Sequence, residues 1–368
     1  MKILYIYCIN ELLKPLLLGI LIFSFLFLSG QIGEIVELIV QKGVPVKYGI
    51  MLLVYYMPAT FAITIPMGLL MGILISFGRL SGDNEINAIK ASGINLLKIM
   101  MPVFAVAMLI TFLLIMFNNT LLPSANNKFR NLYFSIGQKK PIVKIDQNIF
   151  LEIDDKTLFI ERISKDKKFM ENIYIKETDK EKGTRQVIFA KQAEWFSYSS
   201  MIKLDLRDGT IHYTDPEKPE KYNIINFSTH TISFSLGDSL SMQTLEKGLR
   251  EMTAGEILAK IKEKAGAFKK HDISLNEFYI EYYKKFSIPF ACLAFAAIGI
   301  PLGLITRRGD KSIGFGLSLL LIFLYYILLI AGETMSGKSG LSPFLAMWLP
   351  NFILLAVGAL LAFFVLRK

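Results

Sequence analysis

The sequence predicts a membrane α-helical protein with six transmembrane helices and an inserted periplasmic all-β domain of jelly-roll-like type. Two observations predict this fold class: six long stretches lack Asp, Glu, Lys and Arg, and a highly charged block separates the first three from the last three. A helix needs roughly 20 apolar residues to cross a bilayer. Each uncharged stretch meets or approaches that length: residues 15–33, 48–78, 99–127, 286–306, 312–332 and 339–366.

The composition excludes an ordinary soluble protein. Hydrophobic residues make up 53% of the 368 residues, and the mean hydropathy is +0.45. Residues 128–285 contain 28 of the 41 Lys and Arg and 24 of the 31 Asp and Glu, so this block cannot lie in hydrocarbon. The first stretch is not typical of a cleavable signal peptide, because Glu11 and Lys14 precede it. With only Cys8 and Cys292, no disulfide framework is predicted.

The basic residues of the short loops predict the orientation. With six crossings, the N-terminus, residues 79–98, residues 307–311 and the C-terminus share one side of the membrane. That side carries Lys2, Lys14, Arg79, Lys90, Lys98, Arg307, Arg308, Lys311, Arg367 and Lys368, whereas the short loops opposite carry Lys42, Lys47 and Lys338. Cytoplasmic loops are enriched in Lys and Arg. Both termini are therefore predicted in the cytoplasm of a bacterium, and the charged block in the periplasm. The net charge of +10 belongs largely to this topology, and no nucleic-acid partner is predicted.

The charged block has the pattern of short strands separated by turns. Alternation is visible at residues 149–153, 157–163, 187–191, 201–207 and 231–236. Turn signals occur at Asp154-Asp155, Asp208-Gly209 and Pro216–Pro219. Eight to ten short strands favour an antiparallel sandwich or jelly roll. Its interior is either a filled structural core or a space for an apolar ligand, and the pattern leaves both open.

A helical connector is predicted to follow the strands, because Thr253 and Glu256 form a capping-box pattern before an apolar helical face. The predicted organisation has four parts: spans 1–3 in residues 1–127, the β domain and its connections in 128–252, the connector in 253–285, and spans 4–6 in 286–368.

A short helix is predicted at about residues 83–92, in the loop between the second and third spans. Asp83 or Asn84 suits its N-cap, Glu85 complements the helix dipole, and Gly93 suits its C-terminal end. Ile86 and Ile89 give it a small apolar face, which fits either a partner's groove or the membrane surface.

Motifs for catalysis and for nucleotide or metal binding give no positive signal. Residues 332–339 match the phosphate-binding pattern GxxxxGK[ST], but an apolar span rather than a strand precedes them, and Pro343 follows closely. His212, His230 and His271 stand outside any zinc-binding pattern. No catalytic residue, metal ligand or cofactor is predicted.

Two further features concern the first two spans. Lys42 and Lys47 flank the turn between them on the outer side, where they either meet an anionic head group or extend to the interface as isolated lysines do. Gly68 and Gly72 form a small-xxx-small pattern that predicts close helix packing.

The chain resembles the LptF/LptG family of permeases in lipopolysaccharide export ABC transporters, through motifs in a shared order along almost its whole length. These motifs are Asn84–Gly93, Leu122-Pro123, Arg130-Asn131, Asp208-Gly209-Thr210-Ile211, Glu281, Ser287-Ile288-Pro289-Phe290 and Gly299-Ile300-Pro301-Leu302-Gly303.

The resemblance implies a transport function in the bacterial inner membrane. Two such permeases normally pair over a dimer of cytoplasmic ABC ATPases, and lipopolysaccharide passes to a periplasmic bridge protein with a jelly-roll fold. The resemblance places Glu85, with Ile86 and Ile89, at the ATPase contact, and Lys42 and Lys47 near the lipid head group. It implies no enzymatic activity in this subunit, because a separate subunit hydrolyses ATP. The alternatives are a mechanotransmitting ABC membrane subunit and an extracytoplasmic scaffold, neither of which moves lipid itself.

Overall fold

The structure is a computed structural model that describes most of the chain in two compact units. The described residues are 2–139, 150–153, 156–163, 169–178, 185–198, 201–214, 222–235, 247–265, 273–306, 311–338 and 341–367. The membrane unit comprises Met1–Arg130 and Gly248–Lys368, and the β unit comprises Asn131–Lys247. We describe each unit by itself.

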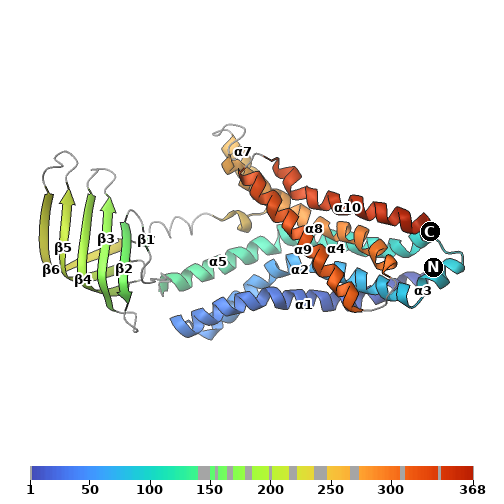
Figure 1. Ribbon diagram of the computed structural model, residues 1–368, viewed down its shortest axis with the longest axis horizontal. Helices are drawn as coiled ribbons and strands as arrows, with labels where there is room; N and C mark the ends of the chain where they lie inside the picture. The colour runs from blue at the N-terminus through green and yellow to red at the C-terminus, as the bar shows by residue number, and fades with distance from the viewer. Residues whose placement is uncertain are drawn as a thin grey trace. The chain divides into compact units, whose positions relative to one another are not determined.

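The membrane unit consists of long helices packed side by side (Figure 1). They are α1 (Lys2–Lys42), α2 (Val46–Gly82), α4 (Leu96–Asn119) continued by α5 (Leu121–Lys139), α8 (Ile273–Ile305), α9 (Lys311–Lys338) and α10 (Pro343–Arg367). Of α5, the residues up to Arg130 belong to this unit. With α4 and α5 counted as one run, six helices in the described residues are long and apolar enough to cross a membrane. The six-span prediction is thus confirmed. Helices suit the bilayer because each satisfies its own backbone hydrogen bonds.

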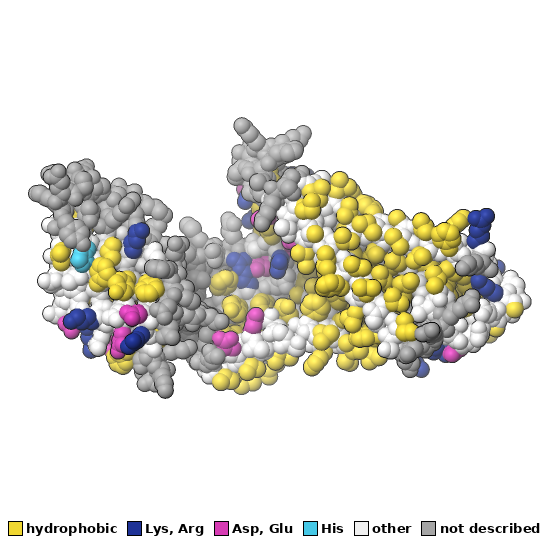
Figure 2. Space-filling view, viewed as in Figure 1, with side chains coloured by type: hydrophobic (Ala, Val, Ile, Leu, Met, Phe, Trp, Pro, Cys, Tyr) yellow, Lys and Arg dark blue, Asp and Glu magenta, His cyan; other side chains and the backbone are white. Residues whose placement is uncertain are grey.

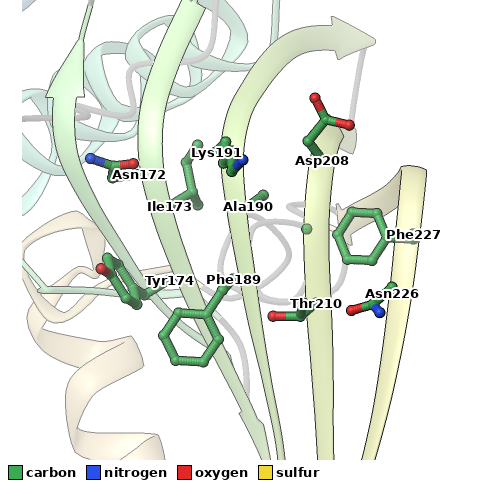
Figure 3. A pocket seen from close by; sticks show the side chains of 11 residues that line it. Asn172, Ile173, Tyr174, Phe189, Ala190, Lys191, Asp208, Thr210, Asn226 and Phe227 are labelled. Atoms are coloured by element: carbon green, nitrogen blue, oxygen red, sulfur yellow. The ribbon is translucent and has the colours of Figure 1, made fainter.

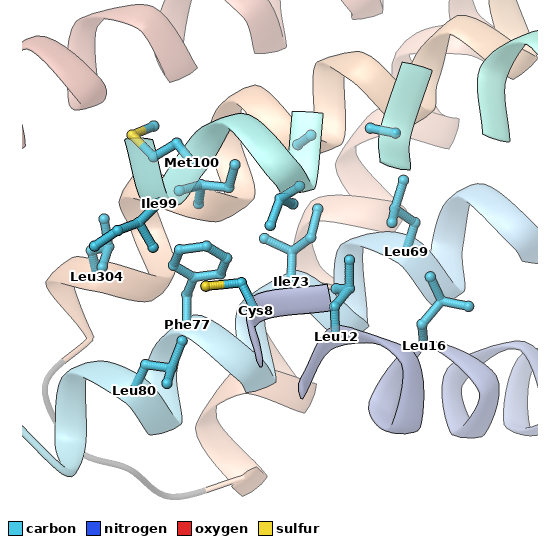
Figure 4. Packing of buried hydrophobic residues seen from close by; sticks show 14 of the residues in the cluster. Cys8, Leu12, Leu16, Leu69, Ile73, Phe77, Leu80, Ile99, Met100 and Leu304 are labelled. Atoms are coloured by element: carbon cyan, nitrogen blue, oxygen red, sulfur yellow. The ribbon is translucent and has the colours of Figure 1, made fainter. Parts of the chain in front are cut away.

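Helices α2 and α8 form the centre of the membrane unit. In their most apolar segments, 78% and 67% of the residues are buried, against 22% in α10. Figure 4 shows Ile73 and Phe77 of α2 packed with Leu12 of α1, Ile99 of α4 and the α8 residue Leu304. Hydrophobic side chains also cover the face of the membrane unit that Figure 2 shows, as expected for a surface in contact with lipid.

Helices α1 and α2 approach closely at glycines. A Cβ atom added to Gly68 would lie 2.8 Å from the backbone nitrogen of Ile20, and one added to Gly72 would lie 3.0 Å from Cα of Leu16. The predicted role of both glycines in helix packing is therefore confirmed. In lipid, such close contact is a main source of helix association.

The β unit contains one six-stranded antiparallel sheet whose strand order follows the chain. The strands are β1 (Phe150–Ile153), β2 (Lys156–Ile163), β3 (Phe169–Thr178), β4 (Arg185–Tyr198), β5 (Met201–Thr214) and β6 (Tyr222–Ser235). An all-β domain inserted between the third and fourth spans is confirmed. The described strands form a meander and are fewer and mostly longer than the eight to ten short strands predicted.

One row of residues interrupts the ladders from β2 to β6: Glu161, Asn172, Lys191, Asp208 and Ser228. Figure 3 shows three of them, Asn172 on β3, Lys191 on β4 and Asp208 on β5. Asn172 and Asp208 have φ values of 53° and 51°, in the left-handed region that non-glycine residues rarely adopt. The register is the same on both sides of the row, with Ala190 opposite Gly209 and Gln192 opposite Arg207. The row therefore bends the strands without shifting their pairing.

The row explains why the buried side chains change their spacing. Buried positions are two residues apart within each half of a strand but three apart across the row: Met170, Ile173 and Ile175 on β3, and Ile188, Ala190 and Ala193 on β4. An extra residue in the extended conformation would turn the inward face outward, because strand side chains alternate between faces. The row interrupts this alternation, and the same face stays buried on both sides of it.

The predicted turn at Asp208-Gly209 is wrong, because both residues lie inside β5. Asp and Gly tolerate the left-handed conformation in turns and in strand irregularities alike, so the local signal does not separate the two. The turns predicted at Asp154-Asp155 and Pro216–Pro219 fall on residues outside those the structure describes.

Gly209→Ala is expected to destabilise the β unit by about 1–3 kcal/mol. Its Cβ would lie 2.2 Å from the carbonyl oxygen of Phe189 and 2.3 Å from Cζ of Phe227. Denaturant unfolding of the full chain, followed by fluorescence in a Trp348→Phe background that leaves Trp195 as the single tryptophan, measures the change. The matched control is Asp208→Gly, which relieves a positive φ and should be neutral or stabilising. If Gly209→Ala were as stable as the parent protein, the close packing of Gly209 against Phe189 and Phe227 would be contradicted.

Candidate functional site

The short helix α3 (Glu85–Ala91) follows α2 after a two-residue turn. Asn84, with a φ of 58°, lets the chain change direction, and Gly93, with a φ of +76°, follows the end of the helix. A glycine in the left-handed conformation is a common helix terminator. Glu85 is consequently the first residue of the helix, where its charge complements the helix dipole.

Glu85 has two partners from other helices of the same chain. The hydroxyl of Tyr7 on α1 donates a hydrogen bond of 2.6 Å to Oε2 of Glu85. Nη1 of Arg79, near the end of α2, lies 3.4 Å from Oε1 of Glu85. The carboxylate thus joins α3 to both α1 and α2.

Arg79 is the centre of this polar cluster. Its Nε lies 2.8 Å from Glu11, its Nη1 lies 3.1 Å from Asp83, and its Nη2 donates to the hydroxyl oxygen of Tyr7 at 3.0 Å. Three carboxylates, those of Glu11, Asp83 and Glu85, therefore surround one guanidinium group. The cluster has an excess of negative charge that a cationic group from a partner would balance.

The two isoleucines of α3 face their own chain. Ile86 is buried, with 5% of its surface exposed, and Ile89 is partly buried against the same core cluster. Asn87, Ala88 and Lys90 are exposed. The predicted partner contact thus separates into an inward face with both isoleucines and an outward face with Asn87, Ala88 and Lys90, and the half-exposed Glu85 lies at one end.

The structure places Lys42 and Lys47 on either side of the turn between α1 and α2. Lys47 is exposed on the first turn of α2. Lys42 is the last residue of α1, and its side chain lies outside the part of the chain that the structure describes.

A different basic site, which the sequence analysis missed, lies inside the membrane unit. A chamber of about 280 Å³ opens between α2, α4, α5, α8 and α9. Its polar lining residues are Asn118, Asn126, Arg250, Glu281, Lys284 and Lys285, and its apolar ones include Ala62, Ile63, Leu122, Ile288 and Leu329. The chamber therefore offers cationic and aliphatic surface together.

Lys285 is the buried charge of this chamber. Only 5% of its surface is exposed, and its Nζ donates to the backbone oxygen of Asn118 at 3.3 Å. By contrast, Lys284 is paired with Glu333 and lies 3.9 Å from Glu281. Burial makes the charge of this ammonium group costly, and the carboxylates of Glu281 and Glu256 offset part of that cost. An anionic ligand at Lys285 would compensate the rest.

The chain segment beside the chamber is held by polar contacts to α5. Nδ2 of Asn126 donates to the backbone oxygen of Arg250 at 3.0 Å. Arg130 forms a largely buried ion pair of 2.7 Å with Glu251 in the short 3-10 helix η1 (Leu249–Glu251). These contacts fix the place where the chain re-enters the membrane unit.

Helical periodicity is the signal that would have revealed Lys284 and Lys285. The two lysines end the helical connector predicted at residues 253–285, next to the uncharged stretch that predicts the fourth span. However, aromatic residues continue at helical spacing through Tyr279, Tyr282 and Phe286, and α8 begins as early as Ile273. The lysines are thus in the body of a 33-residue helix.

The β unit has a hollow of its own, of about 600 Å³, along the interrupted row of the sheet (Figure 3). The rings of Tyr174 and Phe189 meet edge to face in it, with centroids 4.8 Å apart. Thr210, Asn226 and Phe227 complete one side. The hollow combines aromatic and polar surface.

The match to the phosphate-binding pattern has no nucleotide-binding geometry. Residues Gly332–Lys338 form the last turns of helix α9, and Gly332 packs against the backbone of Ala346. Ser339 lies outside the described residues. A phosphate-binding loop requires a strand before the glycines and a helix after them.

Comparison with known proteins gives one result. Residues 6–365 match the family described as lipopolysaccharide export system permease LptF/LptG. A search of curated proteins found no match.

Proposed function

Because the chain belongs to the LptF/LptG family of lipopolysaccharide export permeases, we propose that it extracts lipopolysaccharide from the outer leaflet of the inner membrane. The family is a permease component of a multisubunit transport complex and is not a known class of enzyme. The chain is accordingly an inner-membrane protein. In the proposed topology both termini and α3 face the cytoplasm, the β unit faces the periplasm, and the lipid leaves toward a periplasmic bridge protein.

The buried Lys285 is the observation that carries the lipid-binding part of the proposal. A lipopolysaccharide head group bears phosphates beside acyl chains, and the chamber sets Lys284, Lys285 and Arg250 beside aliphatic side chains. A phosphate at Lys285 would compensate a charge that is otherwise buried at a cost. Lys42 and Lys47 remain proposed head-group contacts at the turn between α1 and α2.

The hollow of the β unit supports the second part of the proposal, transfer toward the bridge protein. Its aromatic rings offer apolar contact to an acyl chain. Since the hydrocarbon must leave the bilayer, an apolar surface in the aqueous compartment lowers the free energy of that transfer.

The polar cluster at α3 supports the proposed contact with a cytoplasmic ABC ATPase dimer. Its excess of carboxylates favours a basic residue on the partner. We assign Glu85 to the contact surface, and Ile86 and Ile89 to the face that passes movement to the spans, because both isoleucines pack inward. The movement requires that α3 dock differently in two nucleotide states.

Replacing the basic groups of the chamber tests lipid binding. Lys285→Gln should weaken lipopolysaccharide binding about tenfold or more, because a charge-assisted contact to phosphate is lost. Photo-cross-linking yield from a probe at position 288, measured in the purified complex, reports the loss. The control is Lys98→Gln at the exposed start of α4, which should leave the yield unchanged. Parallel Lys42→Gln and Lys47→Gln variants show whether the head group instead binds at that turn. If the Lys285→Gln variant gives the same cross-linking yield as the unmodified protein, the chamber is not the lipid site.

Reversing the charge of Glu85 tests the motor contact. Glu85→Lys should reduce both co-purification of the ATPase and ATP-dependent lipid release several-fold, since it places a cation where a basic partner residue is expected. Glu34→Lys, at an exposed site on α1, is the matched charge-reversal control and should retain both. If Glu85→Lys retains both activities, Glu85 has no part in coupling.

A further inference from the structure

The side chains of Tyr7, Arg79 and Glu85 form a closed triangle of contacts. Tyr7 donates to Glu85 at 2.6 Å, Arg79 donates to Tyr7 at 3.0 Å, and Arg79 lies 3.4 Å from Glu85. Each residue belongs to a different helix: α1, α2 and α3, respectively. The triangle is thus a direct polar link between the first two spans and the short helix.

The geometry of the triangle requires a guanidinium group. Arg79 uses Nε toward Glu11, Nη1 toward Asp83 and Glu85, and Nη2 toward Tyr7. A lysine has a single nitrogen on a flexible stem and cannot reproduce this planar set of directions. Arg79→Lys is therefore not a conservative change at this site.

The short helix depends on such contacts for its position. Seven residues are too few for a helix to be stable by itself. Among the described residues of α3, Ile86 is the one that is fully buried, while Ile89 is partly buried. The triangle supplies the polar restraint at the end of the helix that follows α2.

The restraint also includes the first span. Tyr7 and Glu11 are four residues apart on α1 and therefore share one face of that helix, and both contact Arg79. These side chains therefore connect α3 to α1 as well as to α2. Glu85 can meanwhile accept a further hydrogen bond, because a carboxylate offers about four acceptor sites.

We propose that Tyr7 and Arg79 are positioning residues that hold α3 on α1 and α2 and carry its movement into the first span. The link to movement rests on the proposed transport function. The role in holding α3 does not rest on that function, because the contacts lie within this one chain.

Amide hydrogen exchange of the purified full chain, without any ATPase, tests the holding role. Tyr7→Phe removes one oxygen and keeps the ring, and it should raise the exchange rates of residues 85–92 several-fold. Arg79→Lys should do the same. The matched control is Tyr48→Phe, since Tyr48 is an exposed tyrosine at the other end of α2, and it should leave those rates unchanged. Unchanged rates in Tyr7→Phe overturn the proposal, whether or not Arg79→Lys can be purified.

Lipid released per ATP hydrolysed, measured with the full complex, tests the transmission of movement. Tyr7→Phe should lower this ratio several-fold relative to Tyr48→Phe, whereas a purely structural contact would lower the yield of folded complex and leave the ratio unchanged. An unchanged ratio overturns the transmission role. Failure of the unmodified complex to release any lipid would instead refute the proposed function, and the exchange measurement would still decide whether the triangle holds α3.

Discussion

Close contact between α1 and α2 is the interaction on which the membrane unit depends. Apolar side chains gain little by leaving lipid for one another, so helix association relies on tight van der Waals contact. Gly68 and Gly72 bring the backbone of α2 to within contact of Leu16 and Ile20 on α1. The same approach, continued toward the helix ends, brings Tyr7 and Glu11 of α1 to Arg79. Helix packing in the apolar region thus determines which polar groups meet beyond it.

The two polar sites of the membrane unit solve opposite electrostatic problems. At α3, three carboxylates surround one guanidinium group and all are partly exposed, so solvent screens the excess negative charge. In the chamber, Lys285 is almost fully buried, and solvent gives it little compensation. The first arrangement suits a reversible contact with a cationic surface. The second suits an anionic ligand that enters an apolar space.

The β unit is constrained by the alternation of side chains along its strands rather than by charge. Side chains alternate along an extended strand, so one residue added to the strand would by itself turn the inward face outward. The row that contains Asn172, Lys191 and Asp208 adds one residue to each of the strands β2–β6, yet the same face is buried on both sides. Two residues at positive φ accommodate this row, which runs beside the hollow of the sheet.

The sequence by itself determined the six spans, the inserted β region and the family, because hydrophobic length, strand alternation and motif order are all encoded locally along the chain. It also identified the glycines that pack α1 against α2. Only the tertiary structure decided that Asp208 and Gly209 lie within a strand, that Ile86 faces inward, and that Lys285 lines a chamber. Each of these depends on neighbours distant in the chain: Phe189 for Gly209, the core beneath α3 for Ile86, and Asn118 for Lys285. Local propensity contains no information about those neighbours, so the sites emerged only when packing brought the segments together.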